Sequence, residues 1–342
     1  MQLIVAGAGW AGERHVQAIR ALALDGRDVQ VAALVDTDAE HLAEKAEQWD
    51  IRATHTDLAD ALEAYPEAEG VVLATPHHVH RAGTEQAAAA GRHVLVEKPM
   101  ALTLADADAM IAACEAAGVA LMVGESVRYE RQPMAVRNAL EQGEIGEPLS
   151  GRIDFIGRGR KTYCYPGRRA WLADPDVCGG GIWMLNGIHT MSLARMLLGE
   201  VRRIDARSVR SDDFRSPLEA TIVALVDFES GPTATMTVSA ELHGYGRFGE
   251  LVLYGSEGTL QVDWRKGREL AIFGEGREPQ RVECGTDERS GAPGSFVRQM
   301  EEFLAAVAEE RRPATGGEGE RQSLAAILAG YESVSTGEPV EL

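Results

Sequence analysis

The residues with the clearest chemical meaning form a glycine-rich loop, Gly7-Ala8-Gly9-Trp10-Ala11-Gly12, directly after the apolar run at residues 3–6. In a strand–loop–helix unit, the first glycine permits a tight turn and the second lets the backbone approach a pyrophosphate. The third allows the helix to pack closely on the strand. The loop therefore predicts a dinucleotide site, with an ordinary glycine turn as the alternative.

An acidic residue, Asp36, follows the next apolar run at residues 29–35. A carboxylate at that place accepts hydrogen bonds from the ribose hydroxyls of NAD and repels the 2′-phosphate of NADP. No Arg or Lys occurs after Asp36 before Lys45. We therefore expect NAD rather than NADP; a solvated acid at a strand end is the alternative.

Further polar residues follow two later expected strands, at the strand ends where open α/β sheets bind ligands. They are Thr75, Pro76, His77 and His80 after the third strand, and Glu97 and Lys98 at the end of the fourth. A lysine at this edge can hold a substrate hydroxyl or carbonyl by a charge-assisted hydrogen bond, although a surface lysine paired with an acid is the alternative. The histidines have no Cys or paired acid at ligand spacing, so we expect no metal there. A helix-entry turn beside the cofactor fits them better.

A basic and aromatic stretch stands out in this acidic chain. It contains Arg158, Arg160, Lys161, Tyr163, Tyr165, Arg168, Arg169 and Trp171. Aromatic faces against a ring and guanidinium groups against a carboxylate or phosphate would suit a substrate pocket. A solvated loop or an intersubunit ion-pair patch is the alternative.

The elements that would position these residues fall into two regions. In the first, short β-branched runs at 3–6, 29–35, 70–74, 93–97 and 120–123 alternate with longer Ala/Leu/Glu-rich stretches, which predicts a doubly wound parallel sheet. From about residue 151, longer alternating runs at 220–228, 233–242, 249–254 and 258–264 predict an antiparallel or mixed sheet with flanking helices. The expected fold is α/β, with a Rossmann domain at 1–124 and a second domain at 125–342.

Composition excludes several functions. The chain of 342 residues carries a formal charge of −19, which repels nucleic acid and anionic bilayers. No apolar stretch reaches the roughly 18 residues that span a membrane, and the four cysteines form no CxxC pair. We expect a cytoplasmic protein with a small-molecule substrate.

Together, the glycine loop, the Thr75-Pro76 segment with His80, the Glu97-Lys98-Pro99 tripeptide and Gly179-Gly180-Gly181 followed by His189 resemble the Gfo/Idh/MocA oxidoreductase family. The resemblance implies a Rossmann domain followed by an α/β domain with a large, open-faced, mostly antiparallel sheet. It implies oxidation or reduction of a hydroxyl or carbonyl carbon, usually on a sugar, inositol or related ring. In such enzymes the residues that match Lys98 and His189 position the substrate and transfer a proton. Arg128 matches a family position near the substrate.

The sequence departs from the family pattern four residues before His189, where inositol dehydrogenases carry Asp and this chain has Leu185, with Asn186 beside it. Without that carboxylate the imidazolium is less stabilised, so we expect His189 to stay largely neutral near pH 7. A packed histidine on a helix is the alternative. In the catalytic interpretation, Asn186 would serve as a neutral orienting group beside His189.

The expected function is hydride transfer between NAD and a secondary hydroxyl or carbonyl of a cyclic polyol, sugar or sugar acid. Lys98, His189 and Asn186 would be catalytic, and Arg128, Tyr163, Arg169 and Trp171 would contact the substrate. The alternatives are a trans-dihydrodiol dehydrogenase, an NAD-recycling lyase or glycosidase, and a noncatalytic NAD-dependent sensor. An exposed apolar sheet face would favour a homodimer or homotetramer.

Overall fold

The computed structural model describes the chain apart from residues 158, 165–166, 168, 242–248 and 264–268, and apart from the side chains of residues 161 and 162. Its contacts divide the chain into two compact units. Unit 1 contains Met1–Tyr129 and Asp287–Arg321, and unit 2 contains Glu130–Thr286 and Gln322–Leu342.

Unit 1 is built on a six-stranded sheet with the order β3-β2-β1-β4-β5-β6, in which every pair of neighbours is parallel. The strands are β1 (Gln2–Ala6), β2 (Gln30–Val35), β3 (Thr54–His55), β4 (Gly70–Leu73), β5 (His93–Glu97) and β6 (Leu121–Gly124). This is the strand order of a dinucleotide-binding Rossmann fold. The five expected strands are confirmed. β3 was not expected, because a strand of two residues is too short to produce a hydrophobic pattern.

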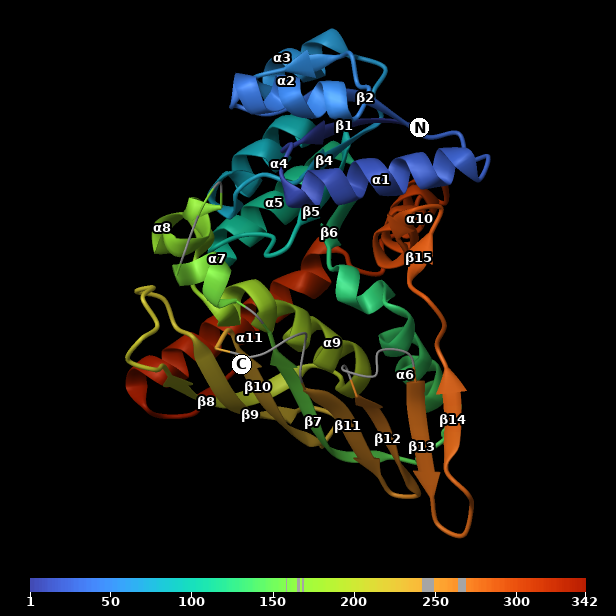
Figure 1. Cartoon of the computed structure of the whole chain (residues 1–342), viewed down its shortest axis with the longest axis vertical. Helices are drawn as coiled ribbons and strands as arrows, with labels where there is room; N and C mark the ends of the chain where they lie inside the picture. The colour runs from blue at the N-terminus through green and yellow to red at the C-terminus, as the bar shows by residue number, and fades with distance from the viewer. Residues whose placement is uncertain (158, 165–166, 168, 242–248, 264–268) are drawn as a thin grey trace. The chain divides into compact units, whose positions relative to one another are not determined.

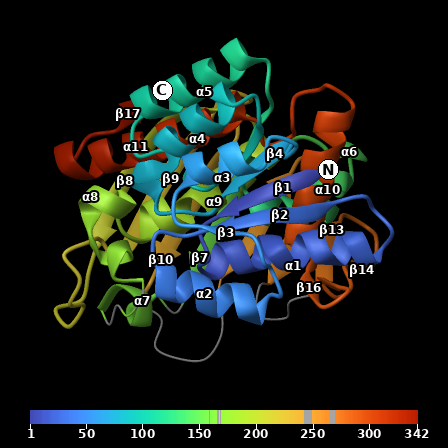
Figure 2. The same ribbon diagram turned by 90° about the horizontal axis from the view of Figure 1, so that it is seen from above.

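Helices cover both faces of this sheet, with α4 and α5 on one face and α1 and α10 on the other (Figures 1 and 2). The helical segments of unit 1 are α1 (Trp10–Leu24), α2 (Ala39–Gln48), α3 (Leu58–Ala64), η1 (His77–Val79), α4 (His80–Ala89), α5 (Leu104–Ala117), η2 (Ser126–Tyr129) and α10 (Gly294–Ala308). Thr103 is confirmed as an N-cap, since its Oγ1 accepts the Asp106 N–H at 3.1 Å. Asp38 and Asp57 cap α2 and α3 in the same way.

The late segment of unit 1 differs from the expectation of one continuous second domain. A short hairpin of β15 (Glu288–Arg289) and β16 (Ala292–Pro293) leads into α10. Phe296 and Phe303 of α10 join the same apolar core as Val16 and Ile19 of α1. Burial of these aromatic rings is what brings residues 287–321 to unit 1. The functional division at residue 124 stays a prediction.

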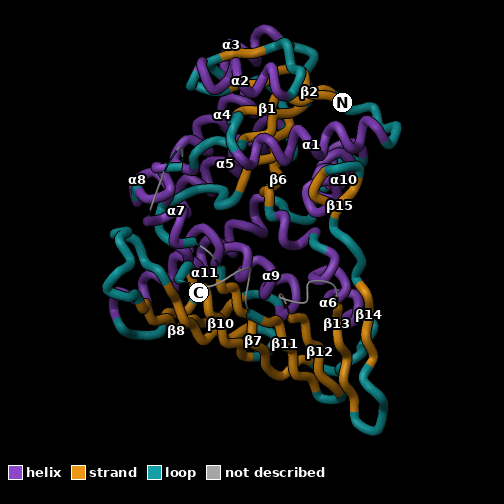
Figure 3. Tube along the Cα trace, viewed as in Figure 1, coloured by secondary structure: helices purple, strands orange, loops and turns teal. Residues whose placement is uncertain are grey.

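Unit 2 is built on a nine-stranded sheet with the order β14-β13-β12-β11-β7-β10-β9-β8-β17 (Figure 3). The strands are β7 (Pro148–Ile156), β8 (Val201–Val209), β9 (Thr221–Phe228), β10 (Thr233–Ser239), β11 (Glu250–Gly255), β12 (Gly258–Asp263), β13 (Glu269–Gly274), β14 (Gln280–Glu283) and β17 (Val340–Glu341). β7 and β10 are parallel, and the other neighbouring pairs are antiparallel. The expected mixed sheet is confirmed; Leu242 and Trp264, expected at two strand ends, lie outside the described residues.

One face of this sheet is covered by helices (Figure 1). The helical segments are α6 (Arg131–Glu141), α7 (Arg160–Cys164), η3 (Ala170–Ala173), α8 (Pro175–Cys178), the π-helix η4 (Trp183–Gly187), α9 (Ile188–Leu198) and α11 (Gly317–Thr336), which belongs to unit 2 from Gln322 on. Along β9, Ile222 and Val226 are buried whereas Val223 and Leu225 are 43% and 45% exposed. The alternation shows that the sheet has one packed face and one exposed face. Among the described residues, no helix is both long and apolar enough to cross a membrane.

Candidate active site

The glycine loop of unit 1 has the geometry that close approach to a ligand requires. Gly7 has a φ of +103°, and a Cβ there would lie 2.3 Å from the carbonyl oxygen of Ala74. A Cβ on Gly12 would lie 1.8 Å from the carbonyl oxygen of Gly7. Gly9, the N-cap of α1, has nothing within 4 Å of its Cβ position. Gly7 and Gly12 therefore form the turn, and Gly9 leaves the helix N-terminus open to a phosphate.

Asp36 lies directly beside this loop. Its Oδ2 accepts the Ala8 N–H at 2.8 Å, and its Oδ1 accepts the Asp38 N–H at 3.0 Å. His41 of α2 also reaches the loop, with Nε2 3.1 Å from the Ala8 carbonyl oxygen. Sequence reasoning missed His41, because nothing in the pattern shows which side of α2 faces the loop. Trp10 is 51% exposed, with its ring edge-to-face against Phe296.

The segment after β4 is held by a buried histidine. His80 is fully buried, and its Nδ1 and Nε2 each lie 3.0 Å from a backbone carbonyl oxygen, of Pro99 and Thr75 respectively. Burial lowers the pKa of this imidazole. The side chain therefore joins the loop after β4 to the segment after β5, and a contact of His80 with the cofactor stays a prediction. His77 is also buried, whereas Thr75 and Pro76 are partly exposed.

Glu97 supports Lys98 from inside unit 1, and its expected contact with the cofactor stays a prediction. Its Oε1 lies 2.8 Å from Nε2 of His15, and its Oε2 accepts the Lys98 backbone N–H at 3.3 Å. His15 is fully buried on α1, three residues after Gly12. Sequence reasoning missed His15; its spacing after the glycine loop is that of an inward-facing position one turn into the helix.

Lys98 directly follows β5, is joined to Pro99 by a cis peptide bond, and is partly buried. Burial lowers the pKa of its ammonium group, and the carboxylates of Glu97 and Glu125 oppose that shift. An ammonium with a lowered pKa gives up its proton more readily than a surface lysine does. Its position and electrostatics therefore suit contact with a reacting oxygen.

Glu125 is a second buried acid at this edge that sequence reasoning missed. It follows β6, is fully buried, and burial raises the pKa of its carboxyl to about 8, with Lys98 opposing the shift. Gly124 before it pairs with Glu97, and a Cβ there would lie 3.0 Å from Glu97 Oε1. Gly124 thus makes room for the Glu97 carboxylate.

Arg128 donates from Nη1 to Oε1 of Glu320 at 2.9 Å. Glu320 is 3% exposed, so this ion pair is largely shielded from water. The pair connects η2 to the late segment of unit 1. Contact of Arg128 with a substrate stays a prediction.

In unit 2, Asn186 and His189 are the partly exposed residues between Gly181 and Thr190, and the rest of that segment is buried. Asn186 lies in the π-helix η4 and His189 in the first turn of α9. Residues three apart share a helix face, so both side chains face the same way. π-turns occur frequently at functional sites. Leu185, at the position of the family Asp, is 6% exposed.

The basic and aromatic stretch separates into different environments. Tyr163 is 3% exposed and packs against Phe214 with ring centroids 6.4 Å apart, and its expected contact with substrate stays a prediction. Burial raises the pKa of its hydroxyl. Arg160 binds Asp213 through both terminal nitrogens. Arg169 is exposed and Trp171 partly exposed, while Arg158, Tyr165 and Arg168 lie outside the described residues.

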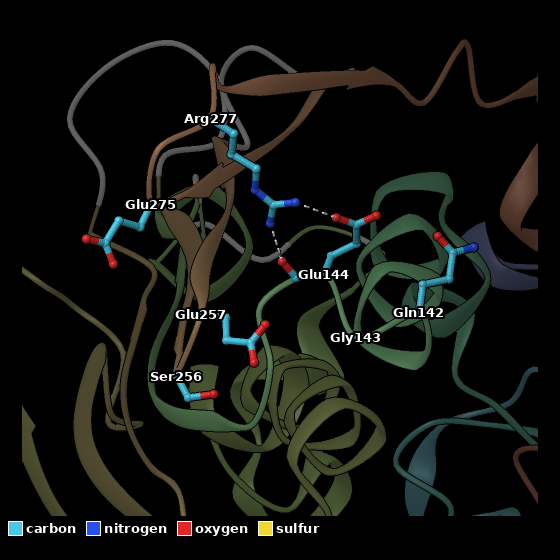
Figure 4. A pocket seen from close by; sticks show the side chains of 7 residues that line it. All are labelled: Gln142, Gly143, Glu144, Ser256, Glu257, Glu275 and Arg277. Atoms are coloured by element: carbon cyan, nitrogen blue, oxygen red, sulfur yellow. Dashed lines mark hydrogen bonds and ion pairs between the residues drawn. The ribbon is translucent and has the colours of Figure 1, made fainter.

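A surface cavity of about 450 Å³ lies elsewhere in unit 2 (Figure 4). It is lined by Gln142, Gly143, Glu144, Ser256, Glu257, Glu275 and Arg277. Arg277 donates to the backbone carbonyl of Glu144 at 2.6 Å and lies 3.4 Å from its carboxylate. None of the expected site residues lines this cavity. Among the described residues, no group of three or more His, Cys, Asp or Glu could hold a metal ion.

Comparison with known proteins agrees with this geometry. Residues 1–125 match the oxidoreductase family with the NAD-binding Rossmann fold, Gfo/Idh/MocA, and residues 134–261 match the C-terminal domain of the same family. The chain is 31% identical over 347 residues to a D-apiose dehydrogenase of Paraburkholderia graminis, covering 98% of this chain and 88% of the relative. The protein therefore belongs to the Gfo/Idh/MocA family of NAD-binding oxidoreductases.

Two further relatives are informative. The chain is 34% identical over 219 residues to 1-carboxy-3-chloro-3,4-dihydroxycyclohexa-1,5-diene dehydrogenase of Comamonas testosteroni, covering 64% of this chain and 53% of the relative. The structure of the present chain resembles that of an oxidoreductase from Agrobacterium radiobacter solved with NAD⁺, L-tartaric acid and magnesium. That similarity has a TM-score of 0.89 at 26% identity and covers 100% of this chain and 98% of the other.

Proposed function

We propose that this protein is a dehydrogenase that transfers hydride between NAD and a secondary hydroxyl or carbonyl of a cyclic polyol, sugar or sugar acid. The observation that carries the proposal is the placement of Lys98 in unit 1. Lys98 follows β5 at the carboxyl edge of the sheet, where β1 also ends in the glycine loop. Bound dinucleotide and a polarising ammonium would thus meet at one sheet edge.

The cofactor would be held by the loop from Gly7 to Gly12, by Asp36 at the ribose, and by Thr75 and Pro76 at the next strand end. Gly9 offers the open N-terminus of α1 to the pyrophosphate. NAD, when bound, supplies the hydride acceptor. The carboxylate of Asp36 supports NAD over NADP.

The chain's own residues would handle the oxygen and its proton. Lys98 would donate a charge-assisted hydrogen bond to the substrate oxygen, and its buried neighbours would keep its geometry fixed. His189 would take the hydroxyl proton during oxidation and return it during reduction. Asn186, on the same helix face, would orient the substrate by neutral hydrogen bonds.

The test is NADH formation during a screen of inositols, sugars, sugar acids and aromatic dihydrodiols. With an active substrate, Lys98→Ala and His189→Ala should each lower kcat about 10²- to 10⁴-fold while NAD binding is retained. Lys45, which is partly buried on α2, and the exposed His78 provide matched controls, as Lys45→Ala and His78→Ala. Full activity of Lys98→Ala would overturn the assignment. NAD binding without turnover of any substrate would favour a sensor, and turnover without net NADH would favour an NAD-recycling lyase or glycosidase.

A carboxylated diol is a second candidate substrate. The helix that carries His189 has a buried Leu185 in place of the family carboxylate, and Arg169 is exposed in the basic stretch. Loss of a carboxylate reduces repulsion of an anionic substrate. The relative from Comamonas is named for a carboxylated cyclic diol. A higher kcat/KM for a carboxylated cyclic dihydrodiol than for the matching dihydrodiol without the carboxylate, reversed by Arg169→Ala, would support this candidate.

We further propose that the protein forms a homodimer or homotetramer in the cytoplasm through the exposed face of the nine-stranded sheet. Val223 and Leu225 on β9 supply apolar area there. Light scattering should give more than one chain per particle, and Leu225→Glu should shift the particles toward monomer. A wild-type monomer at all concentrations would contradict the proposal.

A further inference from the structure

Two residues far away in sequence cap the helix that carries Asn186 and His189. A helix begins with four backbone N–H groups that have no partner within the helix. Here these are the N–H groups of residues 181–184, since the first intrahelical bond of this segment runs from Leu185 N–H to the Gly181 carbonyl at 3.0 Å. The segment has no Ser, Thr, Asp or Asn at its start that could serve as a local cap.

Glu219, two residues before β9, accepts three of these four groups. Its Oε2 accepts the Gly181 N–H at 2.9 Å, and its Oε1 accepts the Trp183 N–H at 2.9 Å. Its backbone carbonyl accepts the Ile182 N–H at 3.4 Å. A carboxylate at this end of a helix is also favoured by the helix dipole.

Tyr331 of α11 completes the cap. Its hydroxyl donates to Oε1 of Glu219 at 2.7 Å and accepts the fourth group, the Met184 N–H, at 3.1 Å. Burial and the adjacent Glu219 raise the pKa of this hydroxyl, so it keeps the proton that it donates. Glu219 and Tyr331 therefore act as one unit.

Two glycines of the triplet, Gly180 and Gly181, leave room for Tyr331 and Glu219. A Cβ on Gly180 would lie 2.1 Å from the Tyr331 hydroxyl, and a Cβ on Gly181 would lie 2.4 Å from the Glu219 carbonyl oxygen. Farther along, Trp183 donates from Nε1 to the Ile327 carbonyl of α11 at 3.0 Å. The start of the helix is thus held both along its axis and in its rotation.

We propose that Glu219 and Tyr331 are positioning residues for the reaction, which set the place and rotation of the helix face that carries Asn186 and His189. The proposal rests on the proposed function of His189. A displacement of about 1 Å in a reacting group can cost roughly 10²-fold in rate. Loosening the cap should therefore lower kcat without removing any group that touches the substrate.

The experiment compares Glu219→Gln and Tyr331→Phe with wild type. Gln has one acceptor oxygen where Glu has two, and Phe leaves the Met184 N–H without its acceptor. We expect each variant to stay folded and to lower kcat about tenfold or more, with the Kd for NAD unchanged. The matched controls are Glu241→Gln, which removes a carboxylate that accepts the Ser211 N–H in the same unit, and Tyr254→Phe, which changes an exposed tyrosine on β11. Neither control should alter kcat.

A second arm tests the route through His189. In a His189→Ala background, Tyr331→Phe should lower kcat by a clearly smaller factor than in wild type, because one of the two side chains that it positions is absent and only Asn186 remains. The same fold-loss in both backgrounds, or unchanged kcat in folded Tyr331→Phe, would overturn the proposal. Full activity of His189→Ala by itself would instead overturn the proposed role of His189. This single-variant measurement therefore separates failure of the proposed function from failure of the positioning role of Tyr331. If Glu219→Gln does not fold, Tyr331→Phe alone decides.

Discussion

The glycine loop of unit 1 and the glycine triplet of unit 2 both lack room for a Cβ atom, but the atoms that occupy this room differ. In the loop of unit 1, the atoms nearest to a Cβ on Gly7 and Gly12 are backbone carbonyls of Ala74 and of Gly7 itself. In the triplet of unit 2, Gly180 is opposed by the hydroxyl of Tyr331. The first turn is closed by backbone carbonyls alone, and the second by the Tyr331 side chain at Gly180 together with the backbone carbonyl of Glu219 at Gly181. A local motif therefore explains the first turn, whereas the second depends on a residue 151 positions away.

Gly12→Ala should be the most damaging change in this comparison. Its Cβ would overlap a backbone oxygen at 1.8 Å, and no side-chain change elsewhere can relieve that overlap. We expect a loss of about 3 kcal/mol or more in the free energy of unfolding, measured by urea denaturation. Gly319→Ala in α11 is the control, since its Cβ meets nothing within 4 Å. Equal stability of the two variants would contradict the close packing of α1 on the loop.

Gly180→Ala should also destabilise, but its effect should depend on Tyr331. Its φ of +156° and the hydroxyl 2.1 Å away both oppose a side chain. Tyr331→Phe removes the nearest atom, so the double variant should lose less stability than the sum of the single losses, by roughly 1 kcal/mol. Additive losses in urea denaturation would show that Tyr331 is not what excludes a side chain at Gly180.

Gly9→Ala separates cofactor binding from folding. Because its Cβ position is open, the melting temperature should stay within about 2 °C of wild type. The added methyl would occupy space that the pyrophosphate approaches, so the Kd for NAD should rise about tenfold or more, measured by calorimetry. Unchanged NAD affinity would place the dinucleotide away from this helix end.

Asp36→Asn should change cofactor preference. The substitution removes the charge that opposes a 2′-phosphate but keeps a side chain that can accept the Ala8 N–H. The ratio of Kd values for NADP and NAD should fall about tenfold. Asp38→Asn, which keeps the cap of α2, serves as the control and should leave the ratio unchanged. No change in Asp36→Asn would remove Asp36 from cofactor selection.

Glu125→Gln should act through a pH dependence of stability. The folded pKa of about 8 lies above the ordinary carboxyl value of 4.5, so the native state holds a proton that the unfolded chain has lost. This group therefore destabilises the fold increasingly as pH rises from about 4.5 to 8. The melting temperature of Glu125→Gln relative to wild type should rise over that range by about 3 °C or more. The exposed Glu115→Gln is the control, and a flat difference would contradict the raised pKa.

Much of unit 1 was predictable because its signals are local. A buried strand, three glycines, an acid after the next strand and a lysine after the fourth each occupy a short window, and the parallel order brings strand ends to one edge. The protein contacts of His80 and Glu97 were not predictable for the complementary reason. A polar residue at a strand end can face a ligand or support its neighbour, and only the positions of Thr75, Pro99 and His15 decide which.

The sequence by itself determined the glycine loop, Asp36, Lys98 and the helix with Asn186 and His189, since each depends on residue types at short spacing. Tertiary structure decided the remainder. It returned residues 287–321 to unit 1, because the aromatic side chains of α10 are buried against α1. It buried Tyr163 and Glu125, and it brought Glu219 and Tyr331 to the N–H groups of the glycine triplet. Unpaired backbone groups and apolar rings must find partners, and those partners are set by how the chain folds in space.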